Sequence, residues 1–351
     1  MMLLFCSALK NKKNNRIITI MDLQDFQKTV QTILSKMSEK IIGQSELCRF
    51  ILMAYIAEGH VLLEGVPGLA KTLTVKTFAE LTGLAFKRIQ FTPDLLPADI
   101  IGTLIFQQGD GTFTVRKGPI FSNIILADEI NRAPAKVQSA LLEAMAEGQV
   151  TIGETSYKLP QPFFVLATQN PIEQDGTYPL PEAELDRFIM KLSVPYPTHA
   201  DEIAIVQTHT TTGKNCNDVT PADSVCTFAE LDLLRKFCSQ VSIDESLTHY
   251  LVSVVAATRP AATELTEQDF FKGSYLSYIT IGASPRASIA MQTCAKIEAA
   301  FSGRSYVIPD DIKKVAYPIL RHRLKLSYEA IAENISADNI IEKILSLIAV
   351  P

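Results

Sequence analysis

The sequence lacks the paired cysteine and histidine spacings of a structural zinc site. Its 6 cysteines and 5 histidines are scattered over 351 residues, and no Cys-x-x-Cys pair occurs. Six cysteines in a chain of this length do not make a disulfide framework either. We therefore expect reduced thiols that pack as small hydrophobic side chains in a cytoplasmic protein.

The sequence also lacks a long apolar run and a basic excess. No stretch of about 18 uninterrupted apolar residues occurs, so no membrane-spanning helix is predicted. The 33 Lys and Arg against 38 Asp and Glu give a formal net charge of −5. Nucleic-acid-binding proteins usually carry a basic excess, so this balance argues against DNA or RNA as the main partner, although it does not exclude one local basic stripe.

The beginning of the chain lacks the features of a secretory signal. Residues 1–6 are apolar, but no basic residue precedes them and the stretch is too short for the hydrophobic part of a signal. A polar, basic stretch follows at residues 10–16. We expect residues 1–21 to be a disordered tail, and a lipoprotein signal at Cys6 is the less favoured interpretation.

The rest of the chain is rich enough in apolar residues, at 47%, to build a large core. Apolar residues at helical spacing predict two helices within residues 22–58, separated by a break at 41–44. Short apolar runs that alternate with helical patterns then predict a parallel α/β sheet. The five runs are residues 61–63, 86–91, 124–127, 163–168 and 189–194, with helices at 71–81 and 135–147 and hairpins at 104–115 and 149–159.

The alternation stops near residues 195–197, which read Pro-Tyr-Pro. Residues 198–351 contain only helical periodicities, including 228–241, 246–257, 287–300 and 309–320. We therefore predict an α/β domain over residues 22–197 and a smaller all-α domain over residues 198–351. The length of the chain agrees with two domains.

The segment from Val61 to Thr72 predicts a buried strand, a Gly- and Pro-containing loop and a helix. Such a loop turns backbone N–H groups and a helix N-terminus toward an anion. Lys71 can reach the β- and γ-phosphates of a nucleotide, and the Thr72 hydroxyl can ligate Mg²⁺. The alternative is an ordinary strand–turn–helix connection. The loop residues expected to bind the nucleotide are Gly65, Val66, Pro67, Gly68, Leu69, Ala70, Lys71, Thr72 and Leu73.

One residue departs from the general phosphate-loop pattern, which has glycine at the position of Ala70. Alanine is the smallest replacement. It does not block the loop if its φ stays below zero.

A second motif is the apolar strand 124–127 followed by Asp128 and Glu129. Strand ends at this edge of an α/β sheet bind ligands. Beside a phosphate loop, Asp128 can hold Mg²⁺ and Glu129 can polarise an attacking water. Alone, the two acids are equally typical of a solvated strand end. After Lys71, with one strand between, they predict nucleotide hydrolysis.

A third motif is the strand 163–168, followed by Gln169, Asn170 and Pro171. Asn170 is predicted to lie level with Glu129 and to contact the γ-phosphate or the attacking water. The alternative is that Asn170 caps a turn before Pro171.

Together these motifs resemble MoxR-type AAA+ ATPases, in which Ala70 is the usual loop residue. The resemblance runs over residues 22–351 and is carried in order by segments 65–72, 89–100, 126–134, 167–174, 178–188 and 282–287. It implies a P-loop NTPase core of three α/β/α layers with a parallel sheet, followed by an all-α lid. It also implies a ring, usually a hexamer, that hydrolyses ATP to ADP and phosphate with Mg²⁺.

The resemblance implies roles for three arginines. Arg187 matches the arginine finger that enters a neighbouring subunit's site, where it would neutralise charge on the transferred phosphoryl group. A surface salt bridge with Asp186 or Glu184 is the alternative. Arg286 matches the sensor-2 arginine of the lid, and Arg132 is a candidate second interface arginine.

Other matches concern the adenine and the client. Gly43 and Gln44 match the segment beside the adenine base. The two hairpins match inserts that face the ring pore, although aromatics packed on their own domain are an equal alternative. The candidate client contacts are Phe106, Phe113 and Arg116.

The function implied by the resemblance is chaperone-like remodelling or maturation of partner proteins, often proteins with von Willebrand factor A domains. An AAA+ motor acting on nucleic acid is the main alternative, and the net charge disfavours it. A transcriptional activator would need a further domain. A scaffold that binds nucleotide without hydrolysis is disfavoured, because all the residues expected for turnover are present: Lys71, Thr72, Asp128, Glu129, Asn170 and Arg187.

Overall fold

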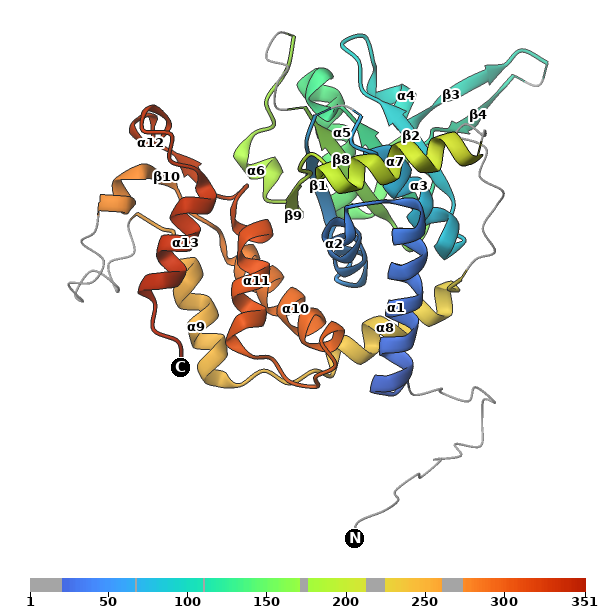
Figure 1. The fold of residues 1–351 in the computed structure, drawn as a ribbon. Helices are drawn as coiled ribbons and strands as arrows, with labels where there is room; N and C mark the ends of the chain where they lie inside the picture. Colours follow the sequence, from blue (N-terminus) through green and yellow to red (C-terminus); the bar gives the residue numbers. More distant parts are fainter. Residues whose placement is uncertain (1–20, 67, 110, 171–175, 213–224, 261–273) are drawn as a thin grey trace, which may run out of the picture.

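The computed structural model describes residues 21–66, 68–109, 111–170, 176–212, 225–260 and 274–351 (Figure 1). The predicted tail therefore lies outside the described residues, except for Met21. A five-stranded sheet has the order β2-β5-β8-β1-β9, and all its pairs are parallel. The five predicted runs are confirmed as its strands: β1 (His60–Glu64), β2 (Phe86–Gln90), β5 (Ile124–Asp128), β8 (Phe164–Gln169) and β9 (Phe188–Ser193).

Helices cover both faces of the sheet. Successive side chains of a strand point to opposite faces, and β1 shows the consequence. Val61 and Leu63 pack in one hydrophobic cluster with helices α1–α3, whereas Leu62 packs in a second cluster with α4 and α5. The arrangement has three layers, as predicted. The covering helices are α1 (Leu23–Lys40), α2 (Ser45–Ile56), α3 (Lys71–Thr82), α4 (Pro97–Ile101) and α5 (Ala135–Glu147).

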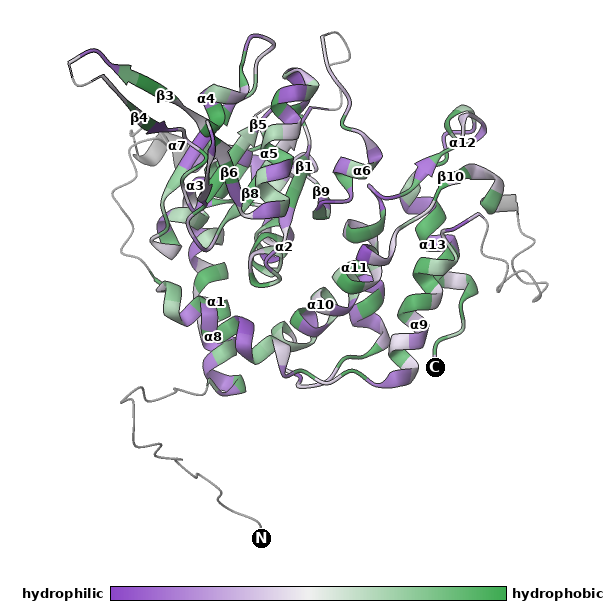
Figure 2. Cartoon of the chain, turned by 180° about the vertical axis from the view of Figure 1, so that it is seen from behind, coloured by the Kyte–Doolittle hydropathy of each residue, from purple (hydrophilic) through white to green (hydrophobic). Residues whose placement is uncertain are grey.

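Both predicted hairpins are present. They pair β3 (Gly102–Gln107) with β4 (Thr112–Lys117), and β6 (Gln149–Ile152) with β7 (Thr155–Lys158). The β3–β4 hairpin projects from the body of the molecule (Figures 1 and 2). Phe106 and Phe113 pair across it with ring centroids 5.2 Å apart, and both remain more than half exposed.

The carboxyl-terminal part is mainly helical, and its four predicted helices are confirmed. The expectation of helical structure alone over residues 198–351 was wrong in one respect, because β10 (Ile279–Ile281) and β11 (Lys325–Leu326) form an antiparallel pair. Such short strands produce no recognisable periodicity. The helices are α7 (His199–Thr212), α8 (Phe228–Ser239), α9 (Glu245–Ala256), α10 (Pro285–Phe301), α11 (Pro309–Leu320), α12 (Tyr328–Ala332) and α13 (Ala337–Leu347).

The helical part packs directly on the first helices of the chain. One hydrophobic cluster runs from α1 and α2 through α8 to α11. Phe26 of α1 stacks on Phe237 of α8 with ring centroids 4.7 Å apart, and Arg49 of α2 pairs with Glu298 of α10 at 2.7 Å. The predicted domain boundary near residue 197 stays a prediction.

The cysteines within the described ranges pack as predicted. Cys48, Cys226, Cys238 and Cys294 are buried free thiols, and burial raises the pKa of each to about 12. Such thiols are almost entirely protonated at neutral pH and therefore poor nucleophiles. In the parts of the chain that the structure describes, no helix has the length and apolar character needed to cross a bilayer.

Candidate active site

A cavity of about 410 Å³ lies where the phosphate loop, β5 and β8 meet at the carboxyl edge of the sheet. Ligands of open α/β sheets bind at this edge. Most of the residues predicted for catalysis and metal binding meet there, although they come from three separate segments of the sequence. The lining residues are Gly68, Ala70, Lys71, Thr72, Leu73, Lys76, Arg88, Asp128, Glu129 and Asn170.

The phosphate loop joins β1 to α3, as the motif predicts. Lys71 is the first residue of α3, and its Nζ donates to the Gly65 carbonyl oxygen at 2.6 Å. Burial lowers the pKa of Lys71, and the charges of Asp128 and Glu129 oppose this shift. A Cβ placed on Gly68 would meet no heavy atom within 4 Å, so the backbone there is open to a ligand. Pro67 lies outside the described residues.

Ala70 does not satisfy the condition set by the sequence pattern. Its φ is 52° and its ψ is 18°, in the left-handed region, instead of a negative φ. The chain turns here directly into α3, where the Ala70 carbonyl accepts from the Thr74 backbone N–H at 2.9 Å. The Cβ of an L-residue costs about 1–2 kcal/mol in this conformation. The loop therefore keeps local strain at a position where the general pattern has glycine.

Asp128, the last residue of β5, has both carboxylate oxygens engaged. Oδ1 accepts from the Thr168 hydroxyl at 2.6 Å, and Oδ2 accepts from Arg88 Nε at 3.0 Å and Nη2 at 2.6 Å. Thr168 is completely buried in β8, and its hydroxyl oxygen accepts from the Glu129 backbone N–H at 2.8 Å. Thr168 thus connects β8 to both acids at the end of β5.

Glu129 lies at a backbone turn before a short 3-10 helix, η1 (Ile130–Arg132). Its φ of 57° is a left-handed conformation, which is uncommon for a non-glycine residue and is concentrated at functional sites. Its Oε2 accepts from Gln90 Nε2 at 2.9 Å and pairs with Arg132 Nε at 3.2 Å. Asn170 directly follows β8, is only 5% exposed and lines the same cavity as Glu129. The two side chains are therefore brought together.

The predicted adenine segment touches the phosphate loop but does not line the cavity. Gly43 has a φ of 77°, and an added Cβ would lie 2.7 Å from the Asp201 carboxyl group of α7. Gln44 is buried and donates from Nε2 to the Leu69 carbonyl at 3.2 Å. Its Oε1 is buried with no partner in the described part of the chain. Its Oε1 has almost no accessible surface from which to contact a ligand in this arrangement.

Of the other residues predicted for the phosphate loop, Val66 packs against the first hydrophobic cluster.

Arg187 and Arg286, two of the three arginines with roles implied by the resemblance, do not line the cavity of their own chain. Arg187 is exposed, and its Nη1 donates to the Leu142 carbonyl at 3.3 Å. Arg286 at the start of α10 is 63% exposed and pairs with Asp186 Oδ2 at 3.6 Å. Asp186 also accepts from buried Arg323 Nε at 2.8 Å. Asp186, one of the acids considered for Arg187, is thus engaged by two other arginines.

Sequence reasoning missed the contributions of β2 and of Thr168. Arg88 and Gln90 lie on one face of β2 and reach the two acids at the end of β5. In the sequence, the only sign of their role was that Arg88 and Gln90 are two residues apart in a predicted strand, which places both side chains on one face. That spacing could point to the two acids only if β2 was known to be the neighbour of β5, with Gln90 opposite Asp128.

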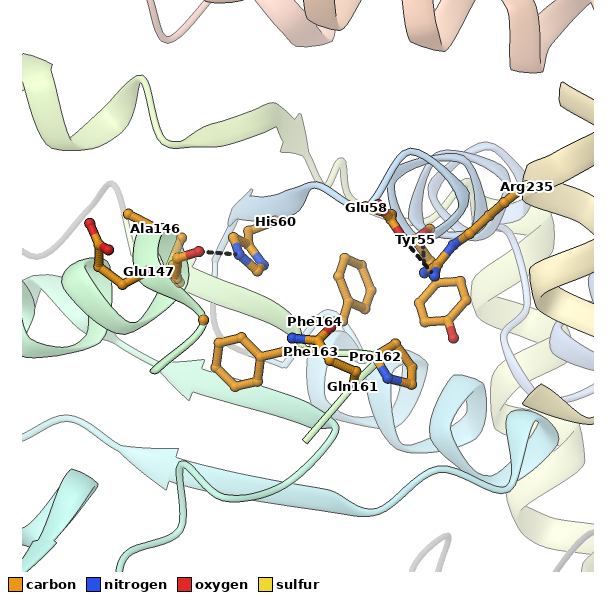
Figure 3. Close-up of a pocket in the computed structure, with 12 residues that line it drawn as sticks. Tyr55, Glu58, His60, Ala146, Glu147, Gln161, Pro162, Phe163, Phe164 and Arg235 are labelled. Atoms are coloured by element: carbon orange, nitrogen blue, oxygen red, sulfur yellow. Dashed lines mark hydrogen bonds and ion pairs between the residues drawn. The ribbon is translucent and has the colours of Figure 1, made fainter. Parts of the chain in front are cut away.

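A second cavity, of about 300 Å³, lies at the amino ends of β1 and β8, at the opposite edge of the sheet (Figure 3). Its histidine is fully hydrogen-bonded. His60 Nδ1 accepts from the Val165 backbone N–H at 3.1 Å, so Nε2 carries the proton and faces the Met145 carbonyl at 3.3 Å. Burial lowers the pKa of His60 to about 4. His60 is therefore a neutral structural residue.

Because of His60, we expect the free energy of unfolding to decrease in mild acid. Its pKa is near 6.5 unfolded and about 4 folded, so the unfolded chain binds the proton first and stability falls as the pH drops from 6.5 toward 4. At pH 5 the loss from His60 is about 2 kcal/mol relative to pH 7.5. Urea denaturation of wild type and His60→Gln at pH 7.5 and pH 5 measures this loss of unfolding free energy. An equal loss in the two proteins would assign the effect elsewhere, for example to buried His322, whose pKa is also lowered by burial.

Comparison with known proteins matches both parts of this fold. Residues 60–190 match the family model of the ATPase family associated with various cellular activities (AAA), and residues 277–344 match the AAA lid domain. The cavity and four strands of the sheet, β1, β2, β5 and β8, fall within the first match, which also includes the beginning of β9. Helices α10 and α11 fall within the second.

Individual relatives align over nearly the whole chain. Chaperone MoxR1 of Mycobacterium tuberculosis is 45% identical over 325 residues, which cover 92% of this chain and 82% of that protein. The uncharacterized protein YeaC of Bacillus subtilis is 41% identical over 93% of this chain and 97% of its own length. A crystal structure from Cytophaga hutchinsonii superposes with a TM-score of 0.84 at 46% identity, covering 94% and 97% of the two chains. This chain therefore belongs to the MoxR family of AAA+ ATPases.

Proposed function

We propose that this ATPase works as a Mg²⁺-dependent, ring-forming chaperone that uses ATP hydrolysis to remodel or mature partner proteins. The observation that carries the catalytic part is the single cavity shared by Lys71, Thr72, Asp128, Glu129 and Asn170. These residues come from the phosphate loop and from the ends of β5 and β8. Their chemistry matches the parts that phosphoryl transfer needs: positioning and charge stabilisation.

The donor set suits a hard cation and a phosphate chain. The Thr72 hydroxyl and the Asp128 carboxylate are oxygen donors of the kind that Mg²⁺ prefers, and they would hold the ion. Bound there, Mg²⁺ would neutralise phosphate charge. The open backbone at Gly68 and the N-terminus of α3 would hold the phosphates, with the Lys71 ammonium beside them. Gly43 and Gln44 would lie beside the adenine base, and Gln44 Nε2 already links this segment to the phosphate loop at Leu69.

Glu129 is the residue of this cavity suited to act as a general base. Its carboxylate would accept a proton from the attacking water as the bond from the water oxygen to the γ-phosphorus forms. The bond from that phosphorus to the β,γ-bridging oxygen breaks in the same step, and ADP leaves with this oxygen. Asn170, an amide with both a donor and an acceptor, would orient that water or the γ-phosphate. Arg286 would have to leave Asp186 to reach the phosphates from the lid, and its high exposure leaves it free to rotate.

The assembly and the clients are argued from the family and from Arg187. Because Arg187 is exposed and outside the cavity of its own chain, it suits insertion into a neighbour's cavity in a homo-oligomeric ring, by analogy a hexamer. A relative at 45% identity is named a chaperone. Protein clients, including those with von Willebrand factor A domains, follow by the same analogy. The net charge of −5 favours proteins over nucleic acid, and the buried reduced thiols favour the cytoplasm.

Steady-state hydrolysis of ATP tests the proposed catalysis. Wild type should turn over ATP with Mg²⁺ and stop when EDTA removes the metal. Lys71→Ala should weaken nucleotide binding itself, measured as a rise in the Kd of a fluorescent ATP analogue. Stimulation of turnover by duplex DNA at physiological salt, without stimulation by candidate partner proteins, would instead support the nucleic-acid motor.

The client is best sought with a protein that binds ATP but does not hydrolyse it. Glu129→Gln should trap the ATP-bound assembly on its partner in an affinity capture. Lys71→Ala under the same conditions is the matched control, because it should not enter the ATP-bound state. Proteins enriched equally by both variants would not be ATP-dependent clients.

A further inference from the structure

The guanidinium of Arg88 lies on the carboxylate that we assign to the metal ion. Arg88 donates to Asp128 Oδ2 twice, from Nε at 3.0 Å and from Nη2 at 2.6 Å. A carboxylate oxygen has about two lone-pair positions, so Oδ2 is fully used. Oδ1 is already bonded to the buried Thr168 hydroxyl at 2.6 Å. A cation that binds Oδ2 must therefore compete with Arg88, and one that binds Oδ1 lies beside the same guanidinium, whose positive charge repels it.

The Arg88 guanidinium is also linked to the second acid, Glu129, by hydrogen bonds through the Gln90 side chain. Arg88 Nη2 also donates to Gln90 Oε1 at 2.6 Å, and Gln90 Nε2 donates to Glu129 Oε2 at 2.9 Å. One hydrogen-bonded row along the edge of β2 thus connects the metal carboxylate to the catalytic carboxylate. Removing Arg88 from Asp128 would also remove a donor from Gln90 Oε1.

We propose that Arg88 is the resident cation of Asp128 and makes metal binding at this carboxylate depend on bound nucleotide. The inference rests on the proposed function, since it takes Asp128 as a metal ligand. Both donors of Arg88 share the single oxygen Oδ2, and hydrogen bonds between charged groups are stronger than those between neutral groups. Mg²⁺ gives up its waters reluctantly and usually binds through one or two carboxylates together with substrate phosphates. The free ion therefore displaces Arg88 poorly, whereas the ion with ATP brings additional ligands.

The burial of the two partners indicates which of them moves. The Asp128 side chain is 13% exposed and is held by Thr168, whereas the Arg88 side chain is 49% exposed. Arg88 can therefore rotate away while the carboxylate stays in place. Arg88 also lines the cavity beside Lys71 and Lys76, so once released it remains close to bound phosphates. A guanidinium suits that environment, because it can donate two hydrogen bonds to a phosphate.

Binding of Mn²⁺, a paramagnetic probe of Mg²⁺ sites, tests this role in the full chain. Electron paramagnetic resonance titrations would compare wild type, Arg88→Gln and the charge-matched control Lys87→Gln, each with and without a non-hydrolysable ATP analogue. Lys87 is exposed on the opposite face of β2. Without nucleotide, Arg88→Gln should bind Mn²⁺ about tenfold or more tightly than wild type, and Lys87→Gln should match wild type. Arg88→Lys should resemble wild type more than Arg88→Gln does, since it retains a charge.

Thermal melting gives a second measurement that a purely structural role would not reproduce. Without nucleotide, Mn²⁺ should raise the Tm of Arg88→Gln and leave that of wild type unchanged. Arg88→Met replaces Arg88→Gln if circular dichroism shows that the latter is unfolded. Unchanged Mn²⁺ affinity in the folded variant, with nucleotide-dependent Mn²⁺ binding intact in wild type, would overturn only the role of Arg88. Failure of wild type to bind Mn²⁺ with the ATP analogue would overturn the proposed metal site itself.

Discussion

Replacing Glu129 with Gln is expected to lower kcat for ATP hydrolysis by about 10²–10⁴-fold while leaving the Kd for ATP nearly unchanged. The substitution preserves the size of the side chain and an oxygen that can accept from Gln90, but it removes the base that would take the proton of water. Nucleotide contacts are assigned to the loop and to Lys71, on the other side of the cavity. Single-turnover hydrolysis and equilibrium binding of a fluorescent ATP analogue measure the two quantities separately.

A matched control for this variant is Glu143→Gln, an exposed residue of α5 that does not line the cavity. It should keep wild-type turnover. Undiminished hydrolysis by Glu129→Gln would show that another group activates the water. A parallel loss of ATP affinity would instead point to collapse of the cavity, since the Glu129 backbone N–H bonds to Thr168.

The elements of the fold could be predicted because their signals are contiguous in the sequence. The three central strands of the sheet, β1, β5 and β8, are short apolar runs that are buried on both faces, as Val61, Leu62 and Leu63 illustrate. The phosphate loop and the Asp128–Glu129 pair are likewise single local motifs. Their meeting at one cavity followed from the rule that parallel strands end at the same edge.

The rest of the site could not be predicted because it depends on which strands are neighbours. Arg88 and Gln90 matter only because β2 lies beside β5, and Thr168 matters only because β8 lies on the other side of β5. The positive φ of Ala70 is a property of the folded turn and has no sequence signature in an alanine. The pairing of Arg286 with Asp186 depends on how the helical part packs on β9.

The role of Arg187 decides whether each active site is shared between two subunits of a ring or is complete within one chain. The residue follows α6 (Glu182–Leu185) and directly precedes β9, whose other end is bonded through Val194 to β1. It is thus attached to the rigid sheet, although its side chain lies outside the cavity formed by the same chain. An exposed guanidinium whose backbone directly precedes a strand of the sheet is suited to enter the site of an adjacent subunit. Turnover would then require two chains to supply one complete site.

Arg187→Ala is accordingly expected to reduce kcat by about 10³–10⁵-fold with little change in ATP affinity, whereas Lys28→Ala, an exposed cation on α1, should have no effect. Mixing Arg187→Ala with Lys71→Ala should restore part of the turnover. An intact loop from the first chain would meet an intact arginine from the second at some of the interfaces. Hydrolysis measured across mixing ratios, with assembly followed by analytical ultracentrifugation, tests this directly. If the mixtures form rings but never exceed the sum of the separate activities, Arg187 acts within its own chain and the shared site is wrong.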